Sequence, residues 1–302
     1  MILWEMDYIK VRRIIKAIHT KGVPVKKPLN GDLVGLTTDP VDVSWNFKDA
    51  QLYALGVGAK VADDLNYLYE GQGPDVIPSF GAIAGNTPLS KVYKLVDIDH
   101  TKLLHGEQAI TLHRPLSPNT KAKAIGKVVN VWDKRKAAIL EVEGEVADDD
   151  GVIFTTKASL FIRGAGGFGG ERGPSSAKDI SPDRPPDFEA SEQVTLEQAA
   201  LYRLTGDLNP LHIEPEFAKQ AGFDRPILHG MSTYGMGCRV AIQSLLEGNL
   251  ARLKSYRGRM TGVVYPGDVL TIKIWKRTSN EAFVAIQARG DQSVLNAHIT
   301  HE

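Results

Sequence analysis

The sequence predicts an α+β protein made of two related halves. Its 302 residues exceed the length of one ordinary domain. A stretch rich in glycine and proline, residues 164–187, divides the chain. In each half, helical segments come first and segments of alternating apolar and polar residues follow. This order favours one long helix packed against a curved antiparallel sheet in each half.

The first half, residues 35–163, ends in three segments that resemble antiparallel strands. Residues 121–132, 137–146 and 152–163 alternate between apolar and polar side chains, which is typical of a strand with one buried face. The acidic stretch Asp148–Gly151 predicts a tight turn between the last two.

Residues 1–34 form an N-terminal extension to which the sequence assigns no role. Its first 27 residues are rich in lysine and arginine, as an organellar presequence would be. However, they contain Glu5 and Asp7 and no serine, whereas presequences are poor in acidic residues and rich in serine. We therefore expect a surface helix or tail.

The dividing segment, residues 164–187, predicts a linker. Gly164, Gly166 and Gly169 match the Gly-x-Gly-x-x-Gly spacing of dinucleotide-binding loops. In such loops a helix follows directly, but Pro174 and further prolines exclude one here. The sequence therefore argues against a nucleotide site in this loop.

The second half, residues 188–302, begins with short helical segments. Thr195 and Gln198 have the spacing of a capping box, which predicts a helix of about three turns ending at Gly206. Pro215 suits the first turn of a short helix that stops at Gly222.

A long helix and a strand meander complete this half. Apolar residues recur at helical spacing from Met231 to Gly248, which predicts a buried helix of about 17 residues. Residues 270–275, 282–289 and 293–300 then predict antiparallel strands at hairpin distances.

Two local patterns recur between the halves. Tyr53 lies in a Leu-Tyr-Ala-Leu-Gly segment that resembles the Leu-Tyr-Arg-Leu-Thr-Gly segment around Tyr202. Pro118 and Pro266 each precede an alternating segment, at almost the same spacing along the chain as the two tyrosines. Matches at nearly one offset indicate a duplicated unit.

Composition narrows the functional classes. Lysine plus arginine and aspartate plus glutamate number 36 each, so the chain has no global charge to hold nucleic acid or an anionic membrane. We find no apolar run long enough to span a bilayer. The single cysteine, Cys238, points to a reducing compartment. His100, His105 and His113 lack the spacing of a helical zinc pair, so we predict no metal site.

The segment Gly206-Asp-Leu-Asn-Pro-Leu-His212 is the strongest chemical signal. Asp207 and Asn209 by themselves are typical of an ordinary turn. His212, however, adds a group that titrates near neutrality beside a carboxylate, as acid–base catalysis requires. Gly230 opens the long buried helix, where its amide N–H lacks a partner within the helix and suits an oxyanion.

These motifs identify a resemblance. Tyr202–His212 together with Gly222–Gly230 resembles the hydratase 2 motif of the MaoC-like family, and in particular the (3R)-specific 2-enoyl-CoA hydratase unit of peroxisomal multifunctional enzymes of type 2. The resemblance runs from about residue 35 to the C-terminus and includes further segments: Tyr53–Ala59, Tyr69–Gly71, Leu104–Gln108, Gly166–Gly170 and Val264–Gly267. It implies a double hot-dog fold, in which two helix-and-sheet repeats pack as a pseudo-dimer.

The resemblance also implies an activity, namely reversible hydration of trans-2-enoyl-CoA to (3R)-3-hydroxyacyl-CoA in β-oxidation, without a cofactor. Asp207 and His212 would share the proton transfers, and which of them acts first as base stays open. Asn209 would orient the water and the Gly230 N–H would stabilise the oxyanion, while Glu70 would also reach the site. Contacts to the CoA part of the substrate would come from His105, Gly106, Lys134 and Met260, with Arg257 and Arg259 as further candidates for phosphate.

Further implications are one active site per chain, since the first half lacks a counterpart of Asp207 and His212, and a homodimer. Relatives of this kind suggest a peroxisomal location; the C-terminal residues 299–302 do not form a peroxisomal tripeptide, and a cytoplasmic or mitochondrial location stays open. The alternatives are a dehydratase acting on another acyl-CoA or an acyl-carrier-protein thioester, and a non-catalytic acyl-CoA-binding module. A thioesterase is disfavoured because it must direct its nucleophile at the carbonyl carbon.

Overall fold

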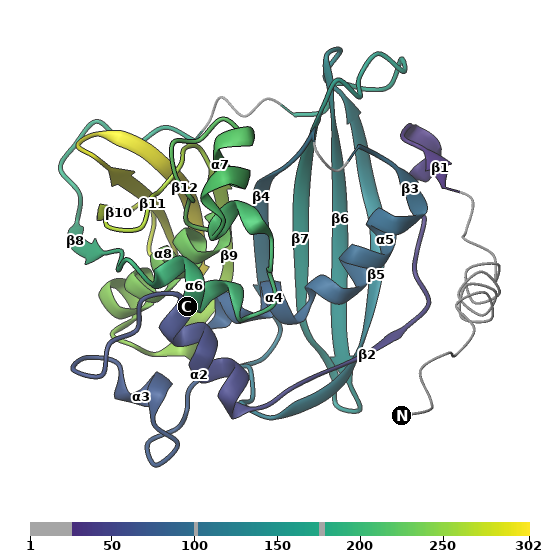
Figure 1. Cartoon of the computed structure of the whole chain (residues 1–302). Helices are drawn as coiled ribbons and strands as arrows, with labels where there is room; N and C mark the ends of the chain where they lie inside the picture. The colour runs from purple at the N-terminus through teal and green to yellow at the C-terminus, as the bar shows by residue number, and fades with distance from the viewer. Residues whose placement is uncertain (1–25, 100–101, 175–178) are drawn as a thin grey trace, which may run out of the picture.

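The computed structural model describes residues 26–99, 102–174 and 179–302 (Figure 1). The predicted N-terminal helix or tail lies mostly outside these residues. Ten strands of the described chain form one antiparallel sheet, and helices cover parts of it. The predicted α+β class with two repeats is therefore confirmed. Among the described residues, no helix is both long enough and apolar enough to cross a membrane.

The two repeats share one sheet, with the strand order β2-β5-β6-β7-β4-β9-β12-β11-β10-β8. The first five strands in this order belong to the first repeat and the last five to the second. The join is made by β4 (Leu103–Leu112), which pairs antiparallel with β9 (Leu253–Met260). The other strands of the sheet are β2 (Val41–Trp45), β5 (Thr120–Asp133), β6 (Ala137–Asp148), β7 (Gly151–Arg163), β8 (Phe188–Gln193), β10 (Val269–Lys276), β11 (Glu281–Ala288) and β12 (Gln292–His301).

The second repeat has the helices that its sequence predicts, with one exception. Helix α8 (Gly230–Leu246) has 17 residues and packs on β9, β10 and β11. Helix α7 (Pro215–Gln220) begins at its proline, and the chain turns at Gly222 with φ +88°. Short 3-10 turns lie at Pro210–His212 and Leu250–Arg252.

The exception is α6 (Gln198–Arg203), which is shorter than three turns and has no capping box. Its N-cap is Glu197 rather than Thr195. Gln198 is buried, and its side-chain amide donates to the carbonyls of Leu55 and Gly56, at the end of a helix in the first repeat. The predicted cap is wrong because Gln198 satisfies the unpaired carbonyls of another helix instead.

The first repeat lacks the single long helix that we expected. Its helical segment divides into α4 (Gly81–Ala84) and α5 (Asn86–Leu95), and α5 lies across β5 and β6 (Figure 1). Pro88 explains the interruption, because it has no N–H to donate to the carbonyl of Ala84 and its ring would collide with that carbonyl. The other regular elements here are α2 (Phe47–Gly56), α3 (Leu65–Leu68), the 3-10 turns Gly31–Leu33 and Pro78–Phe80, and the small parallel pair β1 (Lys27–Pro28) and β3 (Val96–Asp97).

One hydrophobic core runs through both repeats. The rings of Tyr53 and Tyr202, the two tyrosines of the recurring pattern, are fully buried with centroids 6.2 Å apart. Gly235 of α8 allows a close approach between the repeats, since a Cβ there would lie 2.3 Å from a methyl of Val57. A second cluster under α5 includes Leu33, so the described end of the N-terminal extension packs into the first repeat.

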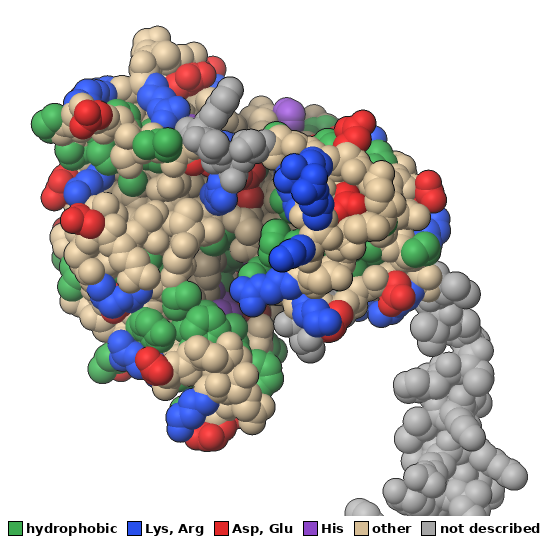
Figure 2. Space-filling model, turned by 90° about the horizontal axis from the view of Figure 1, so that it is seen from above, with side chains coloured by type: hydrophobic (Ala, Val, Ile, Leu, Met, Phe, Trp, Pro, Cys, Tyr) green, Lys and Arg blue, Asp and Glu red, His purple; other side chains and the backbone are tan. Residues whose placement is uncertain are grey.

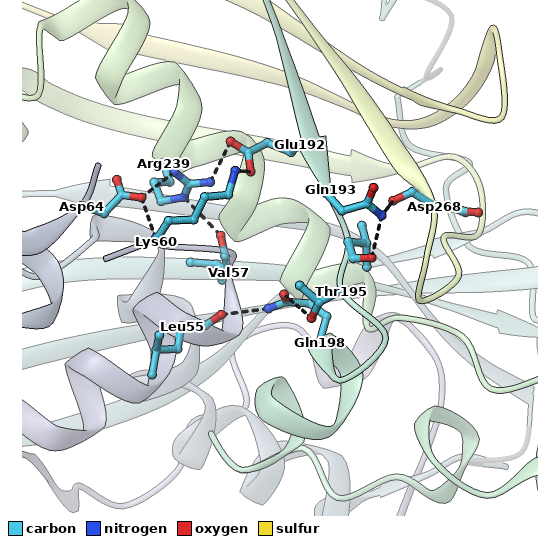
Figure 3. A network of polar contacts seen from close by, with 11 residues as sticks. Leu55, Val57, Lys60, Asp64, Glu192, Gln193, Thr195, Gln198, Arg239 and Asp268 are labelled. Carbon is cyan, nitrogen blue, oxygen red and sulfur yellow. Dashed lines mark hydrogen bonds and ion pairs between the residues drawn. The ribbon is translucent and has the colours of Figure 1, made fainter. Parts of the chain in front are cut away.

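A buried ionic network also joins the repeats (Figure 3). Arg239 of α8 donates to the Asp64 carboxylate at 3.1 Å and to the Val57 carbonyl at 3.2 Å. It also forms an ion pair with Glu192 at 3.0 Å, and Glu192 in turn pairs with Lys60 at 3.1 Å. The chain that follows α2 is thereby attached to the central helix of the second repeat.

Candidate active site

A large cavity lies between the two repeats. Its volume is about 1860 Å³, which exceeds the roughly 300–1,000 Å³ of sites for drug-sized ligands. Figure 2 shows the hollow from above, with Lys and Arg side chains along its border and a histidine inside it. Its walls come from β4 to β7, from β9, from the 207–212 loop and from the start of α8. The seam between the repeats is therefore also the site of the cavity.

Two consecutive turns shape the 207–212 loop. The Asp207 carboxylate accepts from the N–H of Asn209 at 3.2 Å, and the Asn209 side-chain oxygen accepts from the N–H of Leu211 at 3.0 Å. The second bond caps the 3-10 turn that ends at His212. Both side chains thus have the structural role expected of Asx residues, and both still line the cavity.

His212 presents one unprotonated nitrogen. Its ring is buried, and Nδ1 lies 2.8 Å from the carbonyl of Ile227. Because a carbonyl only accepts, Nδ1 carries the proton of the neutral ring and Nε2 keeps its lone pair. Burial lowers the pKa of His212, which favours this neutral form. His212 is therefore suited to accept a proton.

The structure adds His229, a residue to which the sequence motifs assign no role. Its ring stacks on that of His212 with centroids 3.6 Å apart, and its Nε2 lies 3.2 Å from the backbone carbonyl of Asp207. Burial, and then the adjacent His212, lowers the pKa of His229 to about 4. In the sequence, the feature that could have pointed to His229 is its position directly before Gly230, the first residue of α8. Its contacts with both Asp207 and His212 become visible in the fold.

Asp207, His212 and His229 have potential metal-ligand atoms within 4.8 Å of one another. The arrangement suits a metal ion poorly. A histidine binds a metal in the plane of its ring, and two stacked rings direct their lone pairs side by side rather than toward one point. Each ring also uses one nitrogen on a backbone carbonyl.

Gly230 supplies a backbone donor to the same cavity. It is the first residue of α8, it lines the cavity, and no acceptor for its N–H is found among the described residues. The positive end of the helix dipole adds to its attraction for an anion. A Cβ at this position would lie 3.1 Å from Cγ of Met260, so the predicted ligand residue Met260 borders the helix start.

The residues predicted to contact CoA all line the cavity, and the charged ones among them have different hydrogen-bond and ion-pair partners. His105 and Gly106 belong to β4, where the pairing with β7 shifts register between His105 and Glu107. Lys134 follows β5 and donates to the carbonyl of Pro174 at 3.1 Å. Arg257 pairs with Glu107 and Asp179, each at 3.4 Å, and Arg259 lies 4.0 Å from Asp179, so both arginines have carboxylate partners.

The structure does not bring Glu70 to this cavity. Glu70 is exposed just after α3, where its carboxylate accepts from Gln51 at 3.0 Å, and it is not part of the cavity lining. The geometry therefore gives no support to its predicted role. The cavity does contain three cations that sequence reasoning missed: Lys157, Arg163 and Arg172.

The chain is similar to known proteins along most of its length. Residues 44–164 match the model of the MFE-2 hydratase 2 N-terminal domain, and residues 177–297 match that of the MaoC like domain. The chain is 41% identical to an enoyl-CoA hydratase of Mycobacterium tuberculosis over 82% of its own length and 90% of that protein. It is 36% identical to the peroxisomal multifunctional enzyme type 2 of Mus musculus, of which it spans 35%.

Solved structures agree in fold. A MaoC-like dehydratase from Phytophthora capsici superposes with a TM-score of 0.82 at 27% identity, covering 90% of this chain and 98% of that one. The peroxisomal multifunctional enzyme type 2 of Drosophila melanogaster gives 0.73 at 31% identity, with 87% and 48% covered. A Mycobacterium tuberculosis protein described as having a double hotdog fold gives 0.57 at 13% identity, covering 89% and 96%, which concerns the fold alone.

Proposed function

Because this chain belongs to the hydratase 2 branch of the MaoC-like family, we propose that it catalyses the reversible hydration of trans-2-enoyl-CoA to (3R)-3-hydroxyacyl-CoA in fatty acid β-oxidation. The observation that carries the proposal is the convergence of Asp207, His212 and the Gly230 amide on one large cavity. A carboxylate, an imidazole and a free amide donor are the groups that this reaction requires.

The reaction begins with charge moving onto the thioester oxygen. Water adds at C3, the electrons of the double bond shift toward the thioester carbonyl, and an oxyanion develops there. The Gly230 N–H donates to this oxyanion, and the dipole of α8 stabilises it further. The interaction accelerates the reaction because it is stronger in the transition state than with the neutral thioester.

Proton transfer is assigned to the 207–212 loop. His212 accepts a proton from the attacking water at Nε2, the nitrogen left free by the bond to Ile227. C2 receives a proton as the oxyanion collapses, and Asp207 and His212 share this exchange as a coupled pair. Asn209 orients the water through its side-chain amide. The scheme uses water and protein groups, so it includes neither a cofactor nor a metal.

The scheme places one active site in each chain, because the acid–base pair belongs to the second repeat. By the repeat alignment, Gly58 occupies the first-repeat position that Asp207 has in the second. In the structure the backbone beside it is otherwise engaged, because the Val57 carbonyl accepts from Arg239. The first repeat thus contributes cavity walls and interface rather than a second acid–base pair.

Location and assembly remain predictions from the resemblance. Relatives at similar identity include peroxisomal enzymes of Mus musculus and Arabidopsis thaliana and proteins of Mycobacterium tuberculosis. A peroxisomal location and a homodimer are therefore part of the proposal.

The test is to follow the ultraviolet absorbance of the enoyl thioester with trans-2-decenoyl-CoA and then to determine the configuration of the product. A (3R) product supports the proposal. Absence of hydration together with tight acyl-CoA binding would favour a non-catalytic module, and a strong preference for the same acyl group on acyl carrier protein would favour a carrier-protein dehydratase.

Two variants test the residue roles. Asp207→Asn and His212→Gln should each lower kcat by about 100-fold or more, because each removes a proton-transfer group while keeping the side-chain shape. Near-wild-type turnover in either, with an unchanged circular dichroism spectrum, would contradict the assignment of that residue.

A further inference from the structure

Asp133 is a buried carboxylate with an unusual set of partners. It is the last residue of β5 and is 5% exposed. One oxygen accepts from the N–H of Gly167 at 2.9 Å and from that of Arg135 at 2.7 Å, and the other accepts from the N–H of Gly169 at 2.9 Å. The bond from Gly167 and the other backbone bonds lower the pKa of Asp133, so this carboxylate is charged at neutral pH.

Two of these donors, Gly167 and Gly169, belong to the glycine-rich loop that matches the dinucleotide-binding spacing. Gly164, Gly167 and Gly169 have φ values of +73°, +90° and +82°, a region that favours glycine. With these conformations the backbone N–H groups converge on one anion, as they do in phosphate-binding loops. Here the anion is Asp133 itself, which leaves the loop closed to an external phosphate.

The same carboxylate holds the β5–β6 turn. Arg135 has φ +68°, a conformation that non-glycine residues adopt rarely, and its N–H is the one bound to Asp133. Lys134, between them, donates its backbone N–H to Ala137 at 2.8 Å. The backbone direction at Lys134 is therefore fixed by Asp133 on one side and by the turn on the other.

The chain after the loop returns alongside β5. The N–H of Asp133 donates to the carbonyl of Glu171 at 2.7 Å. Gly173 lies flat on the indole of Trp132, since a Cβ there would be 2.4 Å from a ring atom. The Lys134 side chain then reaches the carbonyl of Pro174. We call residues 171–174 the strap.

This arrangement places three cations in the wall of the cavity near the β5–β6 turn. Lys134, Arg163 and Arg172 all line it. Asp133 lies beside Lys134 in sequence, but its oxygens are occupied by backbone N–H groups. CoA carries phosphates on its nucleotide part, and a chain without net charge must bind them with a local cluster.

We propose that Asp133 is a positioning residue that, through the glycine-rich loop, places Lys134 and the strap residue Arg172 for the phosphate-bearing nucleotide part of CoA. The inference rests on the proposed function for the identity of the ligand. It goes further because it assigns the glycine-rich loop a part in substrate binding. The loop would act by binding the Asp133 carboxylate, rather than by binding a phosphate of the ligand directly.

The test compares two substrates that differ only in the nucleotide. Asp133→Asn places an amide among N–H donors, so one donor loses its acceptor and the loop shifts. With an enoyl-CoA we expect KM to rise about tenfold and kcat to stay within about twofold. With the same acyl group on pantetheine, which lacks the nucleotide, KM should not change. Lys134→Ala should give the same pattern. The control is Asp42→Asn, which removes an exposed carboxylate paired with Lys123 and should leave KM and kcat unchanged for both substrates.

An equal rise in KM for both substrates, or an unchanged KM for the enoyl-CoA, would overturn the inference. Should Asp133→Asn fail to fold, Arg172→Ala and Lys134→Ala carry the same comparison, because both residues line the cavity and neither is buried. Titration calorimetry with CoA alone separates this inference from the proposed function. A wild-type chain that binds CoA but hydrates nothing refutes the function only, and the variants should still weaken CoA binding about tenfold; an unchanged affinity refutes the inference.

Discussion

Protonation of His229 should destabilise the fold in a defined pH range. In the folded chain burial and the stacked His212 lower its pKa to about 4, from 6.5 for an ordinary histidine. Between these two values the unfolded chain binds a proton on His229 that the folded chain does not. The contribution of His229 to stability is therefore fully present above about pH 6.5 and is lost as the pH falls toward about 4.

The difference between 6.5 and about 4 corresponds to about 3 kcal/mol, at roughly 1.4 kcal/mol for each pH unit. The variant His229→Gln isolates this contribution. Glutamine can still donate to the carbonyl of Asp207, but it does not titrate. Urea unfolding of both proteins across this pH range should show the wild type losing about 3 kcal/mol more than the variant.

The matched variant removes the background from titrating groups that do not interact with His229, since these contribute equally to both proteins. Parallel curves of unfolding free energy against pH would refute the reasoning, because they would mean that His229 has an ordinary pKa in the folded state. A variant that loses stability equally at every pH would show only a packing defect.

Three further predictions concern the network, the acid–base pair and Glu70. Arg239→Met should lower the unfolding free energy by about 3–5 kcal/mol in urea titrations, because it leaves the buried Asp64 carboxylate without its ion-pair partner and leaves Glu192 with Lys60 alone. Lys60→Met at the half-exposed end of the same network should cost about 1 kcal/mol or less, and equal losses in the two variants would contradict this reasoning. In the pH profile of kcat/KM, the acidic limb should lie below pH 6.5, because burial lowers the pKa of the base His212; a limb above that value would argue against His212 as base. Glu70→Gln should leave kcat and KM within about twofold, since its side chain lies outside the cavity, and a loss as large as that of His212→Gln would return it to the site.

The sequence predicts an element well when the spacing of its own apolar residues determines which of its residues are buried. Helix α8 is buried along most of its length, as its many apolar residues predict. Strands β10 and β12 largely bury every second residue, as their alternation predicts, whereas β11 is buried on both faces from Ala282 to Ile286. The start and length of helix α6 are predicted wrongly, because the hydrogen-bond partners of Gln198 lie more than 140 residues earlier in the chain. No local pattern contains them.

The candidate site divides in the same way. Asp207, His212 and Gly230 follow from their spacing around one turn and one helix start, and the structure brings them to one cavity. The role of His229 depends on the stacking of its ring on that of His212, which its position in the sequence does not show. The glycine-rich loop was excluded as a nucleotide site on its prolines, yet the sequence could not show that the anion it surrounds is Asp133, which precedes it by a whole hairpin.

The pairing of β4 with β9 has a consequence for how the chain avoids aggregation. Two separate five-stranded sheets would have four open edges, whereas the joined sheet of the described residues ends only at β2 and β8. Both are short, at five and six residues, and β8 contains Glu189 and Glu192, features that discourage further strand addition. Either repeat produced alone would expose β4 or β9, of ten and eight residues, as an unprotected edge. Fusion of the repeats therefore protects the solubility of the chain, and this benefit persists whether or not the first repeat keeps any chemistry of its own.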